Sequence, residues 1–271
     1  MSSNWLHHRA AVPSRFRTAF FAATLSTLSW PAATVFARTV EEALLAGDQA
    51  YAAARLEEAR AAYEEAVKAA PRNVTALCRA SRACSELGET QKGDTQRMTW
   101  AEAVKHAREA VRAAPDSAPS HVWLAVALGR QSLKEGAKTR LALSKEIKAE
   151  VDRAMALNPG IGRAWHIVAV WNMRIADLNT MERMAANAVL GGVPKGASRE
   201  LAEQAFRRAI DLEPDYVNHR VEYGRLLKTM KRTADARREL EKALSLPPTS
   251  SALDVRYQSE ARAMLEKLPR R

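Results

Sequence analysis

The side chains best suited to metal or nucleophilic chemistry are two cysteines and the four histidines that follow residue 37. The histidines fall one to each predicted helix, so no two lie within one turn, as paired zinc ligands often do. They are His106, His121, His166 and His219. Cys78 and Cys84 lie six residues apart on one predicted helix, about 9 Å along its axis, which is too far for a disulfide. We therefore expect no metal site and two buried cysteines.

Motifs that carry enzymatic chemistry are absent from the sequence. It contains no G-x-S-x-G, no H-E-x-x-H and no G-x-G-x-x-G that follows a strand. The segment 191–198 is rich in glycine and includes Lys195, but it lacks the Gly-Lys-Ser/Thr ending of a phosphate-binding loop and follows a predicted helix. We therefore expect no catalytic residue, no cofactor and no enzymatic activity.

One spacing of small, apolar and proline residues occurs five times along the chain, and it indicates the helices that would position a binding surface. Ala59, Tyr63, Ala66 and Pro71 are separated by four, three and five residues. The same separations recur in four further copies, which begin at Ala103, Ile147, Ala202 and Ala236 and end at Pro115, Pro159, Pro214 and Pro248. The first three positions share one helix face, small Ala allows a neighbouring helix to approach closely, and Pro ends the helix.

A second amphipathic helix precedes each copy, so the sequence predicts five helical hairpins. Their bounds are about 40–71, 74–115, 120–159, 162–214 and 217–248. The first and last hairpins resemble the tetratricopeptide repeat, and Pro214 and Pro248 are 34 residues apart, which is its standard period. Extra residues in the fourth copy leave room for an added helix over 178–190, and a final helix over 251–268 caps the stack. The predicted fold is all-α, a tetratricopeptide-like solenoid of helical hairpins wound as a right-handed superhelix.

The N-terminal residues 1–37 are typical of a secretory signal peptide. Three arginines and no acid precede or flank an apolar run over 18–30, and Ala37 ends a segment of small residues. We expect cleavage after Ala37, a mature domain over 38–271, and a periplasmic or secreted location. A mitochondrial transit peptide is the alternative.

A concave groove is the predicted binding surface, because the first helix of each hairpin lines the inner face of such a stack. The side chains expected there are apolar in a central stripe and basic at the margins. They are Tyr51, Arg79, Arg82, His121, Leu124, Gln131, Arg163, His166, Met173, Arg174, Arg225 and Lys228. Trp171, beside the added helix, is a further candidate to line a pocket. This surface suits a protein or peptide partner bound through charge-assisted arginine contacts, or an anionic phospholipid.

The positive net charge of the chain indicates which kinds of partner it suits. The formal net charge is +11, and residues 220–271 hold 13 basic against 7 acidic side chains, a surplus that suits docking on an anionic membrane surface. An exported protein does not meet nucleic acid in the cytosol, so we expect no nucleic-acid partner.

Several short segments together resemble the regulator of microtubule dynamics family over about residues 41–267. They are residues 120–125, 135–136, 144–148 and 158–159, and Trp171 followed by 181–183. The resemblance implies an all-helical repeat domain with protein partners and, as in the family member at endoplasmic reticulum–mitochondria contacts, phospholipid binding and transfer. The predicted export signal argues against microtubule association, because tubulin is cytosolic.

Overall fold

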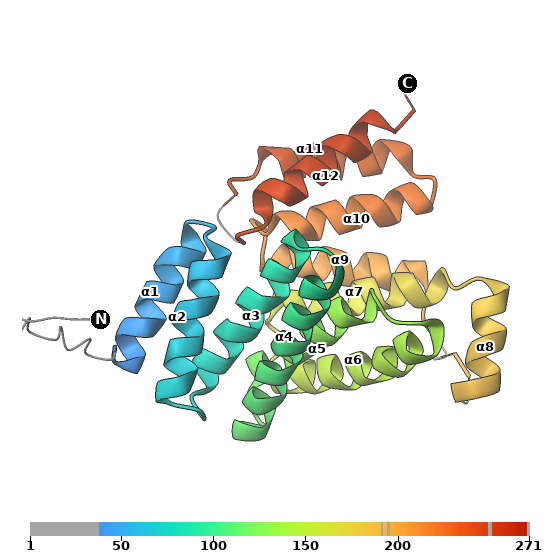
Figure 1. The fold of residues 1–271 in the computed structure, drawn as a ribbon. Helices are drawn as coiled ribbons and strands as arrows, with labels where there is room; N and C mark the ends of the chain where they lie inside the picture. Colours follow the sequence, from blue (N-terminus) through green and yellow to red (C-terminus); the bar gives the residue numbers. More distant parts are fainter. Residues whose placement is uncertain (1–37, 191, 194–195, 249–250, 270–271) are drawn as a thin grey trace, which may run out of the picture. The chain divides into compact units, whose positions relative to one another are not determined.

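Helices make up most of the backbone that the structure describes. The computed structural model describes residues 38–190, 192–193, 196–248 and 251–269, and the predicted leader over 1–37 lies outside these ranges. The described residues hold twelve helices and no strand. The helices are α1 Val40–Ala52, α2 Leu56–Ala69, α3 Val74–Thr90, α4 Gly93–Ala113, α5 Ala118–Ser132, α6 Ala137–Leu157, α7 Gly162–Ala176, α8 Thr180–Leu190, α9 Arg199–Leu212, α10 Val217–Thr229, α11 Thr233–Ser245 and α12 Asp254–Glu266. The predicted all-α solenoid with an added helix is confirmed (Figure 1).

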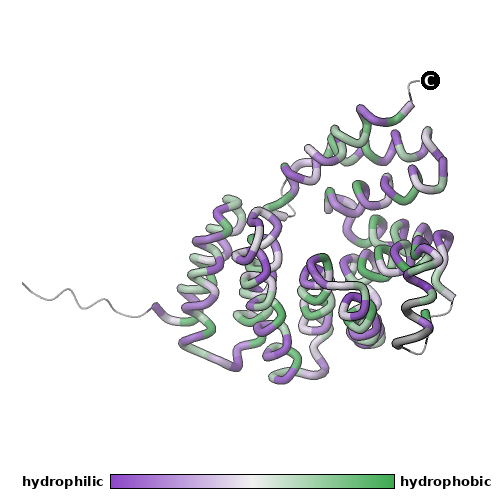
Figure 2. The backbone as a smooth tube through the Cα atoms, turned by 45° about the vertical axis from the view of Figure 1, so that its right-hand side comes forward, coloured by the Kyte–Doolittle hydropathy of each residue, from purple (hydrophilic) through white to green (hydrophobic). Residues whose placement is uncertain are grey.

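Consecutive helices pair as antiparallel hairpins. α1 packs on α2, α3 on α4, α5 on α6, and α10 on α11, whereas α7 packs on α9 because α8 is inserted between them and packs on α6. Figure 2 shows hydrophilic and hydrophobic residues interspersed along the helices. In α2 the buried residues Ala59, Tyr63 and Ala66 recur at helical spacing, so one apolar face packs against the neighbouring helices.

Local sequence sets where several helices begin and end. Thr39 and Glu42 form a capping box at the start of α1, in which each side chain accepts from the other's backbone N–H. The Asn73 side chain likewise accepts from Ala76 N at the start of α3, at 3.0 Å. α2, α4, α6 and α9 each end two residues before a proline, because proline disfavours helical geometry in the residue before it.

Small residues allow the two helices of a hairpin to approach closely. Ala59, Ala103 and Ala236, which share one position of the repeat, are fully buried. In the first hairpin the ring of Tyr63 occupies the space beside Gly47, where a Cβ would lie 2.3 Å from Tyr63 Cε1. The hairpin interior is therefore filled at this position by the large side chain of one helix packing on the bare backbone of the other.

The C-terminal segment reaches back to the first two hairpins. α12 packs on α10 and α11, and its first turn lies beside the end of α3 (Figure 1). Ala252 N donates to Tyr51 Oη at 3.2 Å, and Ser251 Oγ donates to Glu86 Oε2 at 3.2 Å. One continuous core cluster includes Tyr51 and Leu87 together with Tyr257. Residues 251–257 thus cover part of the inner face of the stack.

A membrane-spanning helix is not found in the ranges that the structure describes, since none of the helices there combines the required length and apolar character.

Candidate functional site

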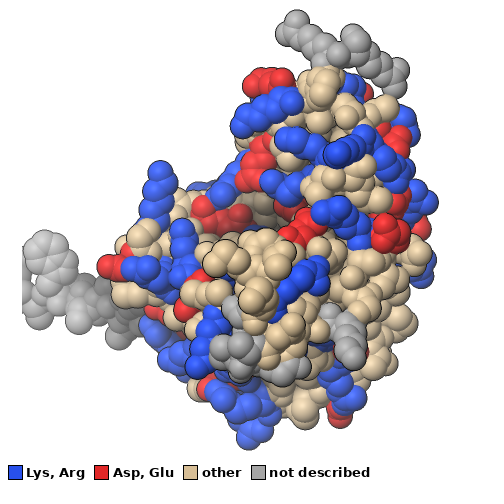
Figure 3. Space-filling model, turned by 90° about the vertical axis from the view of Figure 1, so that its right-hand side faces the viewer, with Lys and Arg blue, Asp and Glu red and all other residues tan. Residues whose placement is uncertain are grey.

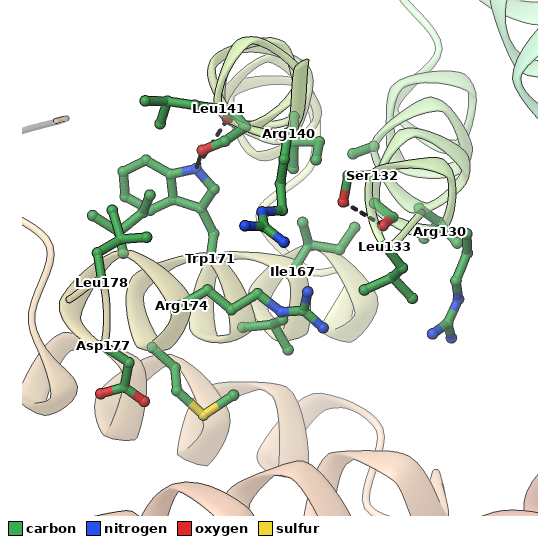
Figure 4. Close-up of a pocket in the computed structure, with 18 of the residues that line it drawn as sticks. Arg130, Ser132, Leu133, Arg140, Leu141, Ile167, Trp171, Arg174, Asp177 and Leu178 are labelled. Atoms are coloured by element: carbon green, nitrogen blue, oxygen red, sulfur yellow. Dashed lines mark hydrogen bonds between the residues drawn. The ribbon is translucent and has the colours of Figure 1, made fainter. Parts of the chain in front are cut away.

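A cavity of about 480 Å³ lies between α5, α6, α7 and α8 and is the strongest candidate for a binding site. Ligand pockets in proteins usually have volumes of about 300 to 1,000 Å³. Its walls are mainly aliphatic and aromatic, and Figure 4 shows Leu133, Leu141, Ile167, Trp171 and Leu178 around it. The inserted helix α8 forms one side of the cavity through Glu182.

Trp171 is the aromatic wall of this cavity. Its side chain is largely buried, and its indole Nε1 donates to the backbone oxygen of Ser144 at 3.0 Å and to Ser144 Oγ at 3.1 Å. These bonds join α7 to α6 and fix the indole plane, as Figure 4 shows. A buried indole N–H without a partner would be costly, so Ser144 and Trp171 hold the wall as a unit.

Basic side chains exceed acidic ones around the cavity. Each of its acids has a partner. Asp177 pairs with Arg199 at 2.6 Å and Glu222 with Arg225 at 3.2 Å, both outside the cavity, whereas Glu182 pairs at 3.4 Å with Arg140, which also lines it. Arg130 pairs with Glu89 of α3. Within the described residues, no hydrogen bond or ion pair involves the side chains of Lys138 or Arg174.

Arg174 extends from α7 along the cavity, on the side where Arg140 descends from α6 (Figure 4). Desolvation lowers the pKa of Arg174, Glu222 opposes this through space, and Arg130, Arg225 and Arg140 lower it further. Glu222 is therefore a counter-charge that acts at a distance, and the guanidinium donors of Arg174 stay available to a carboxylate or phosphate.

A smaller chamber of about 50 Å³ adjoins the cavity on the inner side of the stack, and the two share Arg130 and His166. Arg163 closes this chamber, with its guanidinium carbon 4.6 Å from the centroid of the Tyr216 ring and 5.3 Å from that of Trp123. Such cation–π contacts stabilise the arginine in a partly desolvated place.

His166, which lines the smaller chamber and is half-buried, pairs with the fully buried His219. Their Nδ1 atoms are 3.0 Å apart, which requires that one donates and the other accepts. Desolvation lowers the pKa of both, and the neighbouring His219 adds to the effect on His166. Glu213, 3.5 Å from His219 Nε2, opposes the lowering at His219. The pair is therefore neutral at pH 7.

The twelve side chains predicted for the groove do not share one surface. His166, Met173 and Arg174 line the cavity, and Arg163 and His166 line the smaller chamber. Arg82 is half-buried and stacks on Tyr51, with its guanidinium carbon 3.8 Å from the Tyr51 ring centroid, and residues 251–257 cover Tyr51.

The other predicted residues lie outside both spaces. Leu124 is a core residue that is 2% exposed, so it is not part of an open groove. His121 is also buried and bonds Glu150 at 2.6 Å and the Pro115 oxygen at 2.8 Å. Four more are placed on or near the surface. These are Arg79, paired with Asp48, Arg225, paired with Glu222 and Glu260, half-buried Gln131, and exposed Lys228.

Sequence reasoning missed the cavity residues of α6 and α8. It assigned the binding surface to the first helix of each hairpin, whereas Leu141 and Arg140 lie on a second helix and Glu182 on the inserted one. The signal that could have found them is the added helix itself, because an insertion beside Trp171 must displace a neighbouring helix and create space.

Several basic side chains near the C-terminus are engaged in ion pairs. Arg220 pairs with Glu239, Arg232 with Glu203 and Asp235, and Arg256 with Glu260, although only Glu203 of these acids lies outside residues 220–271. On the face shown in Figure 3, blue and red atoms alternate over the part formed by α10–α12 instead of gathering into one basic field. This weakens the prediction of an electrostatic membrane surface there.

A comparison with protein families matches residues 43–269 to the regulator of microtubule dynamics protein 1–3 family. The chain belongs to the regulator of microtubule dynamics family. The resemblance inferred from the sequence is thereby confirmed for almost the whole of the helical domain.

Curated members of the family are identical to this chain at about a quarter of the aligned positions. This member is 28% identical to regulator of microtubule dynamics protein 1 of Caenorhabditis elegans over 191 residues, which covers 70% of this chain and 84% of the relative. It is also 28% identical to regulator of microtubule dynamics protein 3 of Rattus norvegicus over 173 residues, 63% of this chain and 36% of the relative. The chain therefore spans about a third of the rat protein.

Solved structures show the same fold. A thermophilic TPR protein of Thermus thermophilus superimposes with a TM-score of 0.60 at 22% identity, over 82% of this chain and 98% of that one. This likeness confirms the tetratricopeptide-like architecture of the family member.

The prediction of a periplasmic or secreted location is wrong. The curated relatives are proteins of eukaryotes, which have no periplasm, and they are named for microtubules, which are not extracellular polymers. Tubulin is cytosolic, so without export the location of the protein no longer excludes microtubule association. The leader over 1–37 stays a prediction, because it lies outside the described residues.

Proposed function

We propose that this family member is a non-catalytic scaffold that binds an acidic, partly apolar segment of a protein partner. The observation that carries the proposal is the α5–α8 cavity, which combines apolar walls with the unpaired Arg174. Apolar side chains of the partner fill the space against Ile167 and Trp171, and a carboxylate of the partner binds the Arg174 guanidinium.

The cavity suits this role better than the concave groove predicted from the sequence. Residues 251–257 already cover the inner face at Tyr51 and Glu86, so a partner there would first have to displace part of the chain's own core. The cavity needs no such displacement, since its volume of about 480 Å³ is already empty space. Of the predicted groove residues, the proposal keeps His166, Met173 and Arg174.

An anionic phospholipid is the second candidate ligand, as the family resemblance implies. The aliphatic lining from Leu133 to Leu178 would accept an acyl chain, and Arg174 with Lys138 would face the phosphate. Both candidates use the same contacts, so the ligand's chemistry must be measured.

Native mass spectrometry of gently purified protein distinguishes the candidates. A bound polypeptide supports the scaffold, and a bound phospholipid supports the second candidate. Arg174→Glu should reduce the occupancy of either ligand more than tenfold, because a charge-assisted contact contributes about 1.5 to 3 kcal/mol and a carboxylate in its place repels the ligand. Arg208→Glu, on an exposed part of α9 away from the cavity, is the matched control and should leave occupancy unchanged. Equal occupancy in the two variants would refute this site.

A further inference from the structure

Three side chains from three successive helices meet away from the α5–α8 cavity. Glu64 of α2, Cys84 of α3 and His106 of α4 place a carboxylate oxygen, a thiol sulfur and an imidazole nitrogen within 4.8 Å of one another. Among the residues that the structure describes, these three are the one group of His, Cys, Asp or Glu side chains close enough together to hold a metal ion. Ligands bound to one tetrahedral ion lie about 3 to 4 Å apart, given metal–ligand bonds of about 2.0 to 2.3 Å.

Helix packing brings the group together. α3 packs against both α2 and α4, and Cys84 lies fully buried on α3. Glu64 and His106 are half-buried, so the group has two members in contact with solvent and one in the interior.

Arg60 orients the carboxylate of this group. Arg60 Nε donates to Glu64 Oε1 at 2.8 Å, and Arg60 Nη2 pairs with Glu102 Oε2 at 2.7 Å. Arg60 and Glu64 are four residues apart on α2, as Glu102 and His106 are on α4, so each pair shares a helix face. The Arg60 bond to Oε1 leaves Glu64 Oε2 available. Metal-binding carboxylates are commonly held by an outer hydrogen bond of this kind.

We propose that Cys84, His106 and Glu64 bind a zinc ion, with water as the fourth ligand. Binding replaces the thiol proton of Cys84, which passes to solvent, by Zn²⁺. The three anionic groups Cys84, Glu64 and Glu102 then balance the charges of Zn²⁺ and Arg60, so the occupied cluster is neutral. A monovalent ion would leave it negative.

The mixed ligand set favours zinc over other common ions. Thiolate, imidazole and carboxylate are the three ligand types that zinc sites in proteins use. Mg²⁺ and Ca²⁺ prefer oxygen ligands and do not select a thiolate. The proposed zinc site is independent of the proposed cavity ligand, because the cavity lies between other helices.

Cobalt provides the direct test, because Co²⁺ bound to a thiolate has a near-ultraviolet charge-transfer band. The full chain, freed of metal with a chelator, is titrated with Co²⁺ and then with Zn²⁺. We expect one Co²⁺ per chain, a thiolate band, and its loss when Zn²⁺ displaces the cobalt.

Cys78 supplies a matched control, since it is also buried on α3 but is not part of the group. Cys84→Ser should abolish the thiolate band, and Cys78→Ser should keep it. His106→Gln should weaken Co²⁺ binding at least about 100-fold, more than the loss of an outer hydrogen bond. Circular dichroism checks that each variant is helical, and if Cys84→Ser does not fold, His106→Gln decides. The proposal would be overturned if the wild-type chain showed no thiolate band. It would also be overturned if Cys78→Ser abolished the band and Cys84→Ser kept it.

Discussion

The indole of Trp100 occupies the space beside Gly88. A Cβ at position 88 would lie 2.4 Å from both Cδ1 and Nε1 of Trp100, and the same Nε1 donates to the Ser85 oxygen at 3.1 Å. The two residues come from α3 and α4, so the second hairpin closes on the bare backbone of Gly88.

Gly88→Ala should therefore destabilise the fold. The added methyl group overlaps a ring that is held by its own hydrogen bond, and overpacking of this kind costs about 1 to 3 kcal/mol. Urea denaturation followed by circular dichroism measures the change. Gly129→Ala on α5 is the control, because its Cβ meets no atom within 4 Å, and alanine there should stabilise by about 0.5 to 1 kcal/mol. A Gly88→Ala protein as stable as Gly129→Ala would contradict this packing.

Two turns hold a non-glycine residue in the left-handed region. Ala54, between α1 and α2, has φ of 57°, and Lys231, between α10 and α11, has φ of 60°. Ala54→Gly and Lys231→Gly should each stabilise by up to about 1 kcal/mol, because glycine adopts this geometry without strain. The greater freedom of glycine in the unfolded chain offsets part of the gain. Chemical denaturation tests this, and a loss of more than about 1 kcal/mol would show that the turns are not strained.

The pair His166–His219 should make stability depend on pH. The folded-state pKa values of His166 and His219 lie below the value of about 6.5 expected for the unfolded chain. As the pH falls below about 6.5, the unfolded chain binds protons that the folded chain does not, so the free energy of unfolding falls. The limit is about 1.4 kcal/mol per pH unit for each histidine, and the loss continues until the folded state titrates.

Urea denaturation at about pH 7.5 and about pH 5.5 measures this dependence. His166→Gln removes one titrating group and should give a smaller difference between the two conditions. Carboxylates with lowered pKa, such as Glu213, titrate below this range and do not account for it. Since desolvation also lowers the pKa of His106 and raises that of Glu89, the variant decides: a His166→Gln chain with the full wild-type difference would refute the assignment of a neutral pair.

Tyr51→Phe should loosen the C-terminal segment. The hydroxyl donates to Glu86 at 2.6 Å and accepts from Ala252 N at 3.2 Å, so its removal leaves two buried groups without this partner. Such a loss costs about 1 to 3 kcal/mol. Hydrogen exchange should show faster exchange over 251–257. Tyr63→Phe is the comparison, because Tyr63 bonds only Asp48 within its own hairpin among the described contacts. Equal exchange in the two variants would mean that Tyr51 does not hold the segment.

The sequence by itself determined the repeated hairpin. The spacing of Ala59, Tyr63 and Ala66 defines one apolar helix face, and Pro71 ends the helix, whatever the rest of the chain does. The added helix was predicted over 178–190 and is observed as α8 Thr180–Leu190. The helix face and its end depend on residues less than two helix turns apart and on a single proline, and the added helix follows from the excess length of the fourth repeat, so the linear sequence is enough to specify them.

Tertiary structure decided which surfaces are open and which side chains meet. Tyr51 was predicted for an open groove, but Ala252, 201 positions away, covers it. Glu64, Cys84 and His106 have no metal-site spacing, because each comes from a different helix and only the packing of α2, α3 and α4 brings them together. Contacts of this kind depend on how rigid helices stack. Helical periodicity tells which face of a helix is buried, and it does not tell which distant residue lies against that face.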